Sequence, residues 1–229
     1  MFDGARTIVI FGDSYSVSSN GASNNTEMSW VYHLKAEHLK DNVTVHNFSM
    51  AGATTEDDLE VQIARYLSTP SKPWTSFPKA ICYVFFLGIN DCGTTEECLL
   101  SEIVEKIPEA ADRLYTEVGA RNFVFINVPP TDRSPGGLPH AEIMKTRIET
   151  WNEEMRTHIS QFVDDTPTAR VSCFSSHDIL SAILDDPEKY GFTEADVVAD
   201  RGGIWVDELH LTSRVHKIIA ERMKKGSGV

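Results

Sequence analysis

Three residues far apart in the sequence have the side chains that acyl-transfer chemistry needs. Ser14 follows an apolar run near the start of the chain, whereas Asp207 and His210 stand close together near its end. A serine hydroxyl attacks an ester only when a base takes its proton, and the base needs a carboxylate that fixes its tautomer and stabilises its cation. The sequence therefore predicts a triad with Ser14 as the nucleophile, His210 as the base and Asp207 as the orienting carboxylate.

Acyl transfer also needs hydrogen-bond donors that face the developing oxyanion. The backbone N–H groups of Ser14 and Gly52 and the side-chain amide of Asn90 are predicted to supply them. A glycine at position 52 lets the backbone approach the substrate without a Cβ atom in the way. The neighbouring Asp91 is expected to brace its loop by hydrogen bonding rather than to react.

These residues must be brought together by a sheet, because each precedes or follows a predicted element. Short apolar runs rich in β-branched and aromatic residues predict strands at 7–12, 43–48, 80–88, 122–128 and 169–174. Strands that alternate with helical stretches are typical of a parallel sheet with helices on both faces. The sequence thus predicts one α/β domain over residues 1–229, a three-layer α/β/α sandwich around five parallel strands, with ligands beyond the carboxyl ends of the strands.

Apolar residues at helical spacing predict the covering helices. One spans 29–39, one spans 55–67 with Thr55 and Asp58 at capping-box spacing, and one spans about 103–118 with a kink or break at Pro108. A fourth spans about 139–163, and Thr212 is the expected N-cap of the last helix. The segments 70–79 and 185–203 are predicted to be irregular surface loops, which could wall or cover the site.

The four polar segments resemble, in order and spacing, the conserved blocks of the GDSL/SGNH hydrolases. These are Gly-Asp-Ser at 12–14, the glycine at 52, the Gly-x-Asn-Asp block at 88–91 and the Asp-x-x-His block at 207–210. The resemblance runs from residue 11 to residue 210, and the first block reads GDSY rather than the commoner GDSL. It implies a flavodoxin-like sheet of order 2-1-3-4-5, ester hydrolysis without a metal or cofactor, and the residue roles given above.

Two finer features are similar to the fungal acetylesterases of carbohydrate esterase family sixteen. They are the segment VPPTDRSP at 128–135 and Trp205, two positions before Asp207. This resemblance implies removal of acetyl groups from hemicellulose-derived sugars, so that an acetylated oligosaccharide is the expected substrate. Trp205 is interpreted as part of the substrate pocket, with a place in the core as the alternative. A short-chain lipase or thioesterase, and a non-catalytic binding protein on the same scaffold, stay open as alternative functions.

The amino-acid composition disfavours some classes of binding partner. The formal charge of −13 disfavours nucleic acid, since such binding depends on clustered Lys and Arg. No apolar run approaches the roughly 20 residues of a membrane span. A small uncharged ester is the partner expected.

The four cysteines show no spacing typical of a zinc site, so no metal is expected. Cys82 and Cys173 are expected to be buried in strands, whereas Cys92 and Cys98 either form a local disulfide or stay free thiols. The first strand begins almost at residue 1, and three Asn-x-Ser/Thr triplets occur at Asn24, Asn42 and Asn47. Together they favour a secreted protein with its signal removed over a cytoplasmic one.

Overall fold

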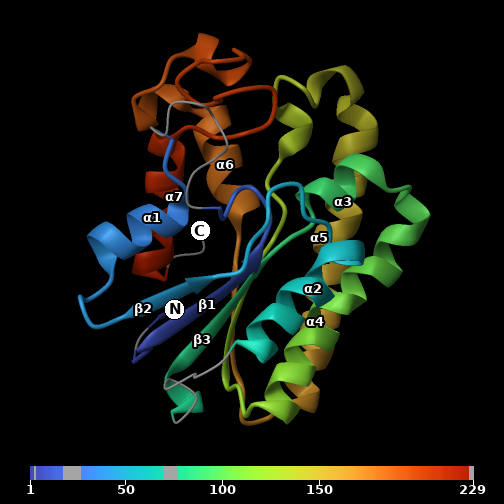
Figure 1. Ribbon diagram of the computed structural model, residues 1–229. Helices are drawn as coiled ribbons and strands as arrows, with labels where there is room; N and C mark the ends of the chain where they lie inside the picture. The colour runs from blue at the N-terminus through green and yellow to red at the C-terminus, as the bar shows by residue number, and fades with distance from the viewer. Residues whose placement is uncertain (3, 18–26, 70–76, 227–229) are drawn as a thin grey trace.

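A parallel sheet forms the centre of the protein in the computed structural model, which describes residues 1–2, 4–17, 27–69 and 77–226. Its strands are β1 (Thr7–Gly12), β2 (Thr44–Asn47), β3 (Ile81–Phe86), β4 (Asn122–Ile126) and β5 (Arg170–Phe174). They are ordered β2-β1-β3-β4-β5, and every neighbouring pair is parallel (Figure 1). The predicted strands and the strand order implied by the resemblance are confirmed.

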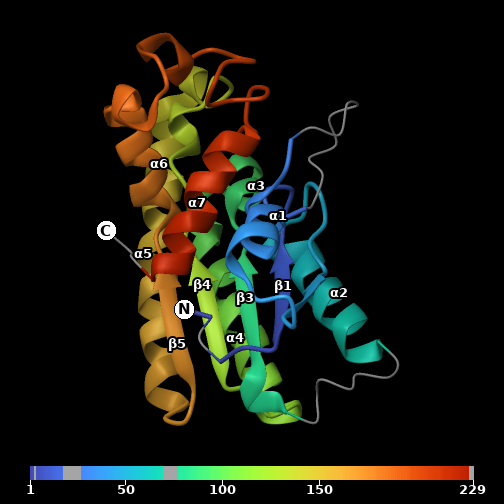
Figure 2. The ribbon, with the colours of Figure 1, turned by 90° about the vertical axis from the view of Figure 1, so that its left-hand side faces the viewer.

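Helices cover both faces of this sheet (Figure 2). One face carries α1 (Trp30–His33), which continues as a π-helical turn η1 (Leu34–His38), and α7 (Ser213–Lys225), which packs against both. The other face carries α2 (Thr55–Ser68), α4 (Leu100–Glu117) and α5 (Ala141–Asp165), packed in that order. The predicted three-layer α/β/α architecture is therefore correct.

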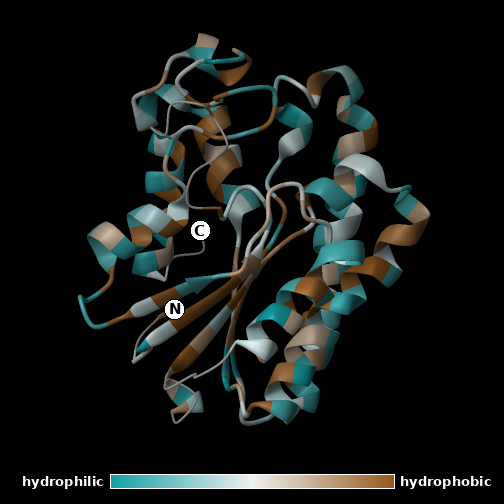
Figure 3. Ribbon diagram, in the orientation of Figure 1, coloured by the Kyte–Doolittle hydropathy of each residue, from teal (hydrophilic) through white to brown (hydrophobic). Residues whose placement is uncertain are grey.

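The inner strands are apolar throughout because they are covered on both faces. All residues of β1 and β3 are buried, whereas the edge strands β2 and β5 are partly exposed. Figure 3 shows this as strongly hydrophobic central strands between helices of mixed hydropathy. Cys173 lies on β5 and is exposed. The prediction that Cys173 is buried is wrong, because apolar character alone does not tell an edge strand from an inner one.

A row of aromatic rings stiffens the sheet below the ends of its strands. The ring centroids of Phe11 and Phe85 lie 5.3 Å apart, and those of Phe85 and Phe125 lie 5.4 Å apart. The Phe162 ring, from α5, packs in a T-shaped arrangement against Phe125. Such ring pairs add roughly 0.5–1.5 kcal/mol each beyond the area that they bury. They give the connections at the carboxyl ends of β1, β3 and β4 a rigid base.

Several details of the helices differ from the prediction. The N-cap of α2 is Thr54 rather than Thr55: its hydroxyl accepts the Asp57 N–H, and its own N–H donates to the Asp58 carboxylate. The helix α4 runs through Pro108 without a break. Thr212 is the N-cap of α7, but its hydroxyl bonds to the Gly203 carbonyl instead of capping the helix.

The segment 185–203 is more regular than expected. It follows an additional helix, α6 (Ser176–Asp185), and contains the 3-10 turns η7 (Pro187–Tyr190) and η8 (Glu194–Val197). The Asp196 carboxylate accepts N–H groups from Thr193 and Gly203, which ties the second turn to the end of the segment. The segment is therefore a surface loop, as predicted, but one that short turns and hydrogen bonds hold in a defined shape. Of the other predicted loop, 70–79, residues 70–76 lie outside the described part of the chain.

Candidate active site

The serine predicted as nucleophile lies in a tight turn directly after β1. Ser14 is only 7% exposed, and the preceding Gly12 is held by two hydrogen bonds of 2.9 Å to the side-chain amide of Gln62 on α2. A Cβ atom at Gly12 would lie 2.9 Å from the hydroxyls of Ser16 and Ser49 and 3.0 Å from the Phe86 carbonyl oxygen, so a larger residue would force these groups to move. The Gln62 clamp was not predicted, because it joins positions that are 50 residues apart.

The histidine and aspartate lie on a short loop just before α7, which reaches the same edge of the sheet. The loop is closed at its base by a bridge between Trp205 and Leu211 and by a hydrogen bond of 2.8 Å from the Val206 N–H to the His210 carbonyl. The Asp207 carboxylate accepts the backbone N–H of His210 at 2.7 Å. This loop therefore holds the imidazole and the carboxylate in a fixed relation.

The three side chains form one hydrogen-bonded chain, although Ser14 and His210 are 196 positions apart. The Nε2 atom of His210 lies 2.9 Å from the Ser14 Oγ, and its Nδ1 atom lies 2.8 Å from the Asp207 Oδ2. With the Nδ1–H donating to the carboxylate, Nε2 is free to accept the serine proton. This is the geometry that general-base activation of a serine requires.

The electrostatics of Asp207 suit an orienting carboxylate. Partial burial acts to raise the pKa of this carboxyl group, but hydrogen bonds from the backbone N–H groups of His210 and Leu209 and from the imidazole outweigh it. The pKa of Asp207 therefore lies below its ordinary value. The group stays ionised across the neutral range and can stabilise a positive charge on His210.

The three residues predicted to supply oxyanion donors lie on the connections that follow β1, β2 and β3. Gly52 follows β2 with a φ of +75°, a conformation that favours glycine, and the space beside its Cα is open. Asn90 lies in the first turn of α3 (Ile89–Thr94), and its side-chain amide donates to the Ala53 carbonyl at 2.9 Å. Within the described residues, the N–H groups of Ser14 and Gly52 donate to no protein acceptor. The backbone N–H groups of Ser14 and Gly52 are therefore available to a substrate oxygen.

Two buried carboxyl groups lie beneath the site. Asp91 bonds the Thr55 N–H through both oxygens, at 2.9 and 3.0 Å, and so joins α3 to the start of α2. Burial raises the pKa of Asp91 to about 6, against the hydrogen bonds that it accepts. Burial raises the pKa of Asp13 to about 7; the hydrogen bond from Tyr15 opposes this shift, and the charge of Asp91 adds to it. The bracing role expected for Asp91 is confirmed.

For Trp205 and for the cysteine pair, the structure shows one of the two alternatives that the sequence left open. Trp205 is fully buried, and its indole N–H donates to the Val197 carbonyl at 2.9 Å. Its side chain therefore lies in the core, which was the alternative to a place in the substrate pocket. Cys92 and Cys98 are both free thiols, the first buried in α3 and the second exposed. The disulfide alternative is thus not what the structure shows.

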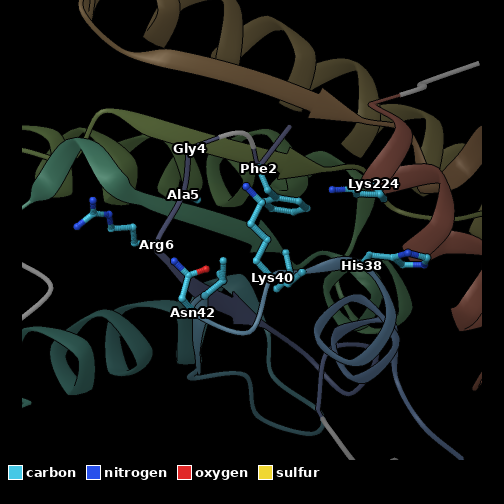
Figure 4. Close-up of a pocket in the computed structure, with 10 residues that line it drawn as sticks. Phe2, Gly4, Ala5, Arg6, His38, Lys40, Asn42 and Lys224 are labelled. Atoms are coloured by element: carbon cyan, nitrogen blue, oxygen red, sulfur yellow. The ribbon is translucent and has the colours of Figure 1, made fainter.

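The protein has a further pocket that is distinct from the predicted active site. A pocket of about 350 Å³ is lined by Phe2, Arg6, His38, Lys40 and Lys224 (Figure 4). It lies where β1 begins, whereas Ser14 follows the end of β1, so it is separate from the site.

The described residues include no group of three His, Cys, Asp or Glu side chains that could hold a metal. In the same part of the chain, no helix has both the length and the apolar character of a membrane span.

The fold and this site define a class of protein. The family model of the GDSL-like lipases and acylhydrolases matches residues 8–223, and the chain belongs to this family. It is therefore a carboxylic ester hydrolase.

An acetylesterase from Thermothelomyces thermophilus is 23% identical to the chain, over 94% of this chain and 86% of its own length. Among solved structures, a lipase from a goat rumen metagenome is similar with a TM-score of 0.63 at 13% identity, covering 96% of this chain and 97% of that one. A catalytic mutant of an acetylxylan esterase from Geobacillus stearothermophilus gives a TM-score of 0.58 at 14% identity, covering 100% of this chain and 97% of that one. Structural likeness at such identities establishes a shared fold.

Proposed function

We propose that this protein is an acetylesterase that removes acetyl groups from carbohydrate esters through an acyl-enzyme on Ser14. The observation that carries the proposal is the continuous chain from the Ser14 Oγ through His210 to Asp207, with hydrogen bonds of 2.9 and 2.8 Å. The acetylesterase relative supports the choice of acyl group. The resemblance of segment 128–135 to carbohydrate acetylesterases supports the choice of alcohol.

The reaction follows from this geometry in two halves. His210 takes the Ser14 proton as the Oγ atom attacks the ester carbonyl, and the oxyanion is stabilised by the N–H groups of Ser14 and Gly52 and by the second N–H of the Asn90 amide. His210 then gives its proton to the sugar oxygen as its bond to the acyl carbon breaks, so that the sugar leaves as an alcohol and an acetyl-serine remains. In the second half His210 takes a proton from water as the water attacks the acetyl carbon, and it then gives this proton to the Ser14 Oγ atom as the bond to the acetyl group breaks and acetate is released. Asp207 stabilises the imidazolium in both halves.

The nucleophile is tested by Ser14→Ala on p-nitrophenyl acetate. We expect turnover to fall at least about 10³-fold with the far-ultraviolet circular dichroism unchanged, because the triad members act as a unit. Ser101→Ala, a change on α4 far from the site, is the matched control and should keep full activity. Retained turnover in the Ser14 variant would reject this serine.

A fluorophosphonate probe tests the competing reading of a non-catalytic binding protein. The wild-type protein should be labelled at one residue, and Ser14→Ala should abolish the labelling. A wild-type protein that does not react near neutral pH would support a binding role instead.

The acyl group is tested by comparing p-nitrophenyl acetate with the octanoyl ester. A site made for acetate should lose kcat/KM steeply as the chain lengthens, because each unaccommodated methylene is worth about 1–3 kcal/mol. A preference for octanoate would indicate a short-chain lipase or thioesterase.

The sugar preference is tested by acetate release from acetylated xylo-oligosaccharides. A rate no higher than that for a simple alkyl acetate would remove the carbohydrate from the proposal.

A further inference from the structure

Tyr15, the residue directly after the nucleophile, is wedged between the Ser14 turn and the loop that carries His210. Its side chain is fully buried. Its ring packs edge-on against Phe86 at 6.1 Å and against His216 at 5.6 Å, and it lies 6.1 Å from the imidazole of His210. A ring held on these sides has little freedom, so its hydroxyl group has a fixed position.

The phenol makes one hydrogen bond that reaches across the site. Its hydroxyl donates to the carbonyl of Leu209 at 2.7 Å, and these two residues are 194 positions apart. Burial, followed by the negative charges of Asp13 and Asp207, raises the pKa of Tyr15 well above its ordinary value. The hydroxyl therefore keeps its proton and stays a donor at any pH at which the enzyme works.

The acceptor belongs to the peptide group that sets the position of the base. The Leu209 carbonyl and the His210 N–H are the two ends of one peptide unit, which is rigid and planar. Tyr15 bonds the first end, and the Asp207 carboxylate bonds the second at 2.7 Å. Both hydrogen bonds act on the backbone immediately before the Cα atom of His210. They fix the direction in which the imidazole points.

At its other end the same residue is anchored to the nucleophile turn. The backbone N–H of Tyr15 donates to the Asp13 Oδ1 at 2.9 Å, so that the residues on both sides of Ser14 are joined. Tyr15 therefore ties the turn that holds the nucleophile to the loop that holds the base, at a distance set by its rigid side chain. A leucine here, as in the commoner GDSL block, would fill the space but could not donate this hydrogen bond.

We propose that Tyr15 is a positioning residue, whose hydroxyl sets the distance between the His210 imidazole and the Ser14 hydroxyl by holding the Leu209 carbonyl. The inference rests on the proposed roles of Ser14 and His210. Because a displacement of the order of 1 Å between reacting groups can cost as much as about 10²-fold in rate, the loss of one hydrogen bond in this tie is expected to reduce the chemical step. Substrate binding should change little, since the buried phenol does not reach the substrate.

The test is Tyr15→Phe, which removes the hydroxyl and keeps the ring. We expect kcat on p-nitrophenyl acetate to fall about tenfold with KM changed less than about twofold, and the rate of fluorophosphonate inactivation to fall by the same factor. Tyr66→Phe is the matched control. It removes another buried phenol hydroxyl, bonded to Tyr83 at 2.7 Å between α2 and β3, and should leave both rates unchanged.

All rates are measured at a temperature at which circular dichroism shows each variant to be folded. A kcat within twofold of wild type in Tyr15→Phe, an equal loss in Tyr66→Phe, or a change confined to KM would each overturn the positioning role. The underlying function fails separately, if Ser14→Ala keeps its turnover. An inactive Ser14→Ala together with a fully active Tyr15→Phe would overturn only the inference about Tyr15.

Discussion

The buried carboxyl group of Asp13 should make the stability of this protein depend on pH. It lies directly before Ser14, fully buried, and its Oδ1 atom accepts the Tyr15 N–H at 2.9 Å. Its Oδ2 atom has no hydrogen-bond partner among the described residues. The substitution Asp13→Asn keeps the oxygen that Tyr15 needs and removes the negative charge. The variant therefore isolates the cost of ionising this group inside the protein.

The magnitude follows from the two pKa values of the group. Burial raises the pKa of Asp13 from 3.8 to about 7. The folded protein thus binds this proton more tightly than the unfolded chain, so the stabilisation is complete below pH 3.8 and is lost as the pH rises toward 7. For one site with these values, the free energy of unfolding falls by about 2–3 kcal/mol between pH 5 and pH 8. Asp13→Asn should not show this loss.

Urea denaturation of both proteins at pH 5, 6, 7 and 8 measures the effect. The difference in unfolding free energy, variant minus wild type, should become more positive by about 2–3 kcal/mol over this range. A constant offset from the amide itself cancels in this comparison. Asp112→Asn, at an exposed position on α4, is the matched control and should give a difference that does not change with pH. A flat or falling difference for Asp13→Asn would refute the reasoning.

Three further substitutions test the site and its frame. Asn90→Ala should lower kcat about 10²–10³-fold with a smaller change in KM, because it removes a proposed oxyanion donor; equal losses of binding and turnover would contradict this. Asp207→Asn should lower kcat on p-nitrophenyl acetate by up to about 10⁴-fold, since an amide favours the wrong tautomer of the histidine, and near wild-type turnover would exclude the orienting role. Gly88→Ala should lower the unfolding free energy by more than about 2 kcal/mol in urea denaturation, because φ is +117° and the new Cβ would lie 2.4 Å from a buried tryptophan ring. Gly93→Ala, where a Cβ meets no neighbouring atom within 4 Å, is its control; similar losses in both would contradict the steric argument.

Much of the fold could be predicted because its signals are local. The runs that became β1 and β3 are apolar without interruption, as strands buried on both faces must be. The helix α6 was missed although its signal is present, since Ile179, Leu180, Ile183 and Leu184 stand at helical spacing behind an N-cap at Ser175. The exposure of Cys173 could not be predicted, because whether a strand lies at the edge depends on pairing with distant segments.

The sequence by itself determined which chemical groups are candidates for catalysis and the order in which they occur. Ser14, Gly52, Asn90, Asp207 and His210 were found from residue types and from their places after strands or before the last helix. Such motifs can be found because each is a short segment with its own backbone requirements, as the positive φ of Gly52 illustrates.

Only the tertiary structure decided how these groups are held and what surrounds them. Three features depend on which distant segments pack together. They are the hydrogen bond from Tyr15 to Leu209, the hydrogen bonding between Gln62 and Gly12, and the burial of Trp205. The same is true of the raised pKa of Asp13, since burial is a property of the whole fold. Residue types fix what a side chain can do, but distances, burial and electric field come from contacts between positions that can lie nearly 200 residues apart.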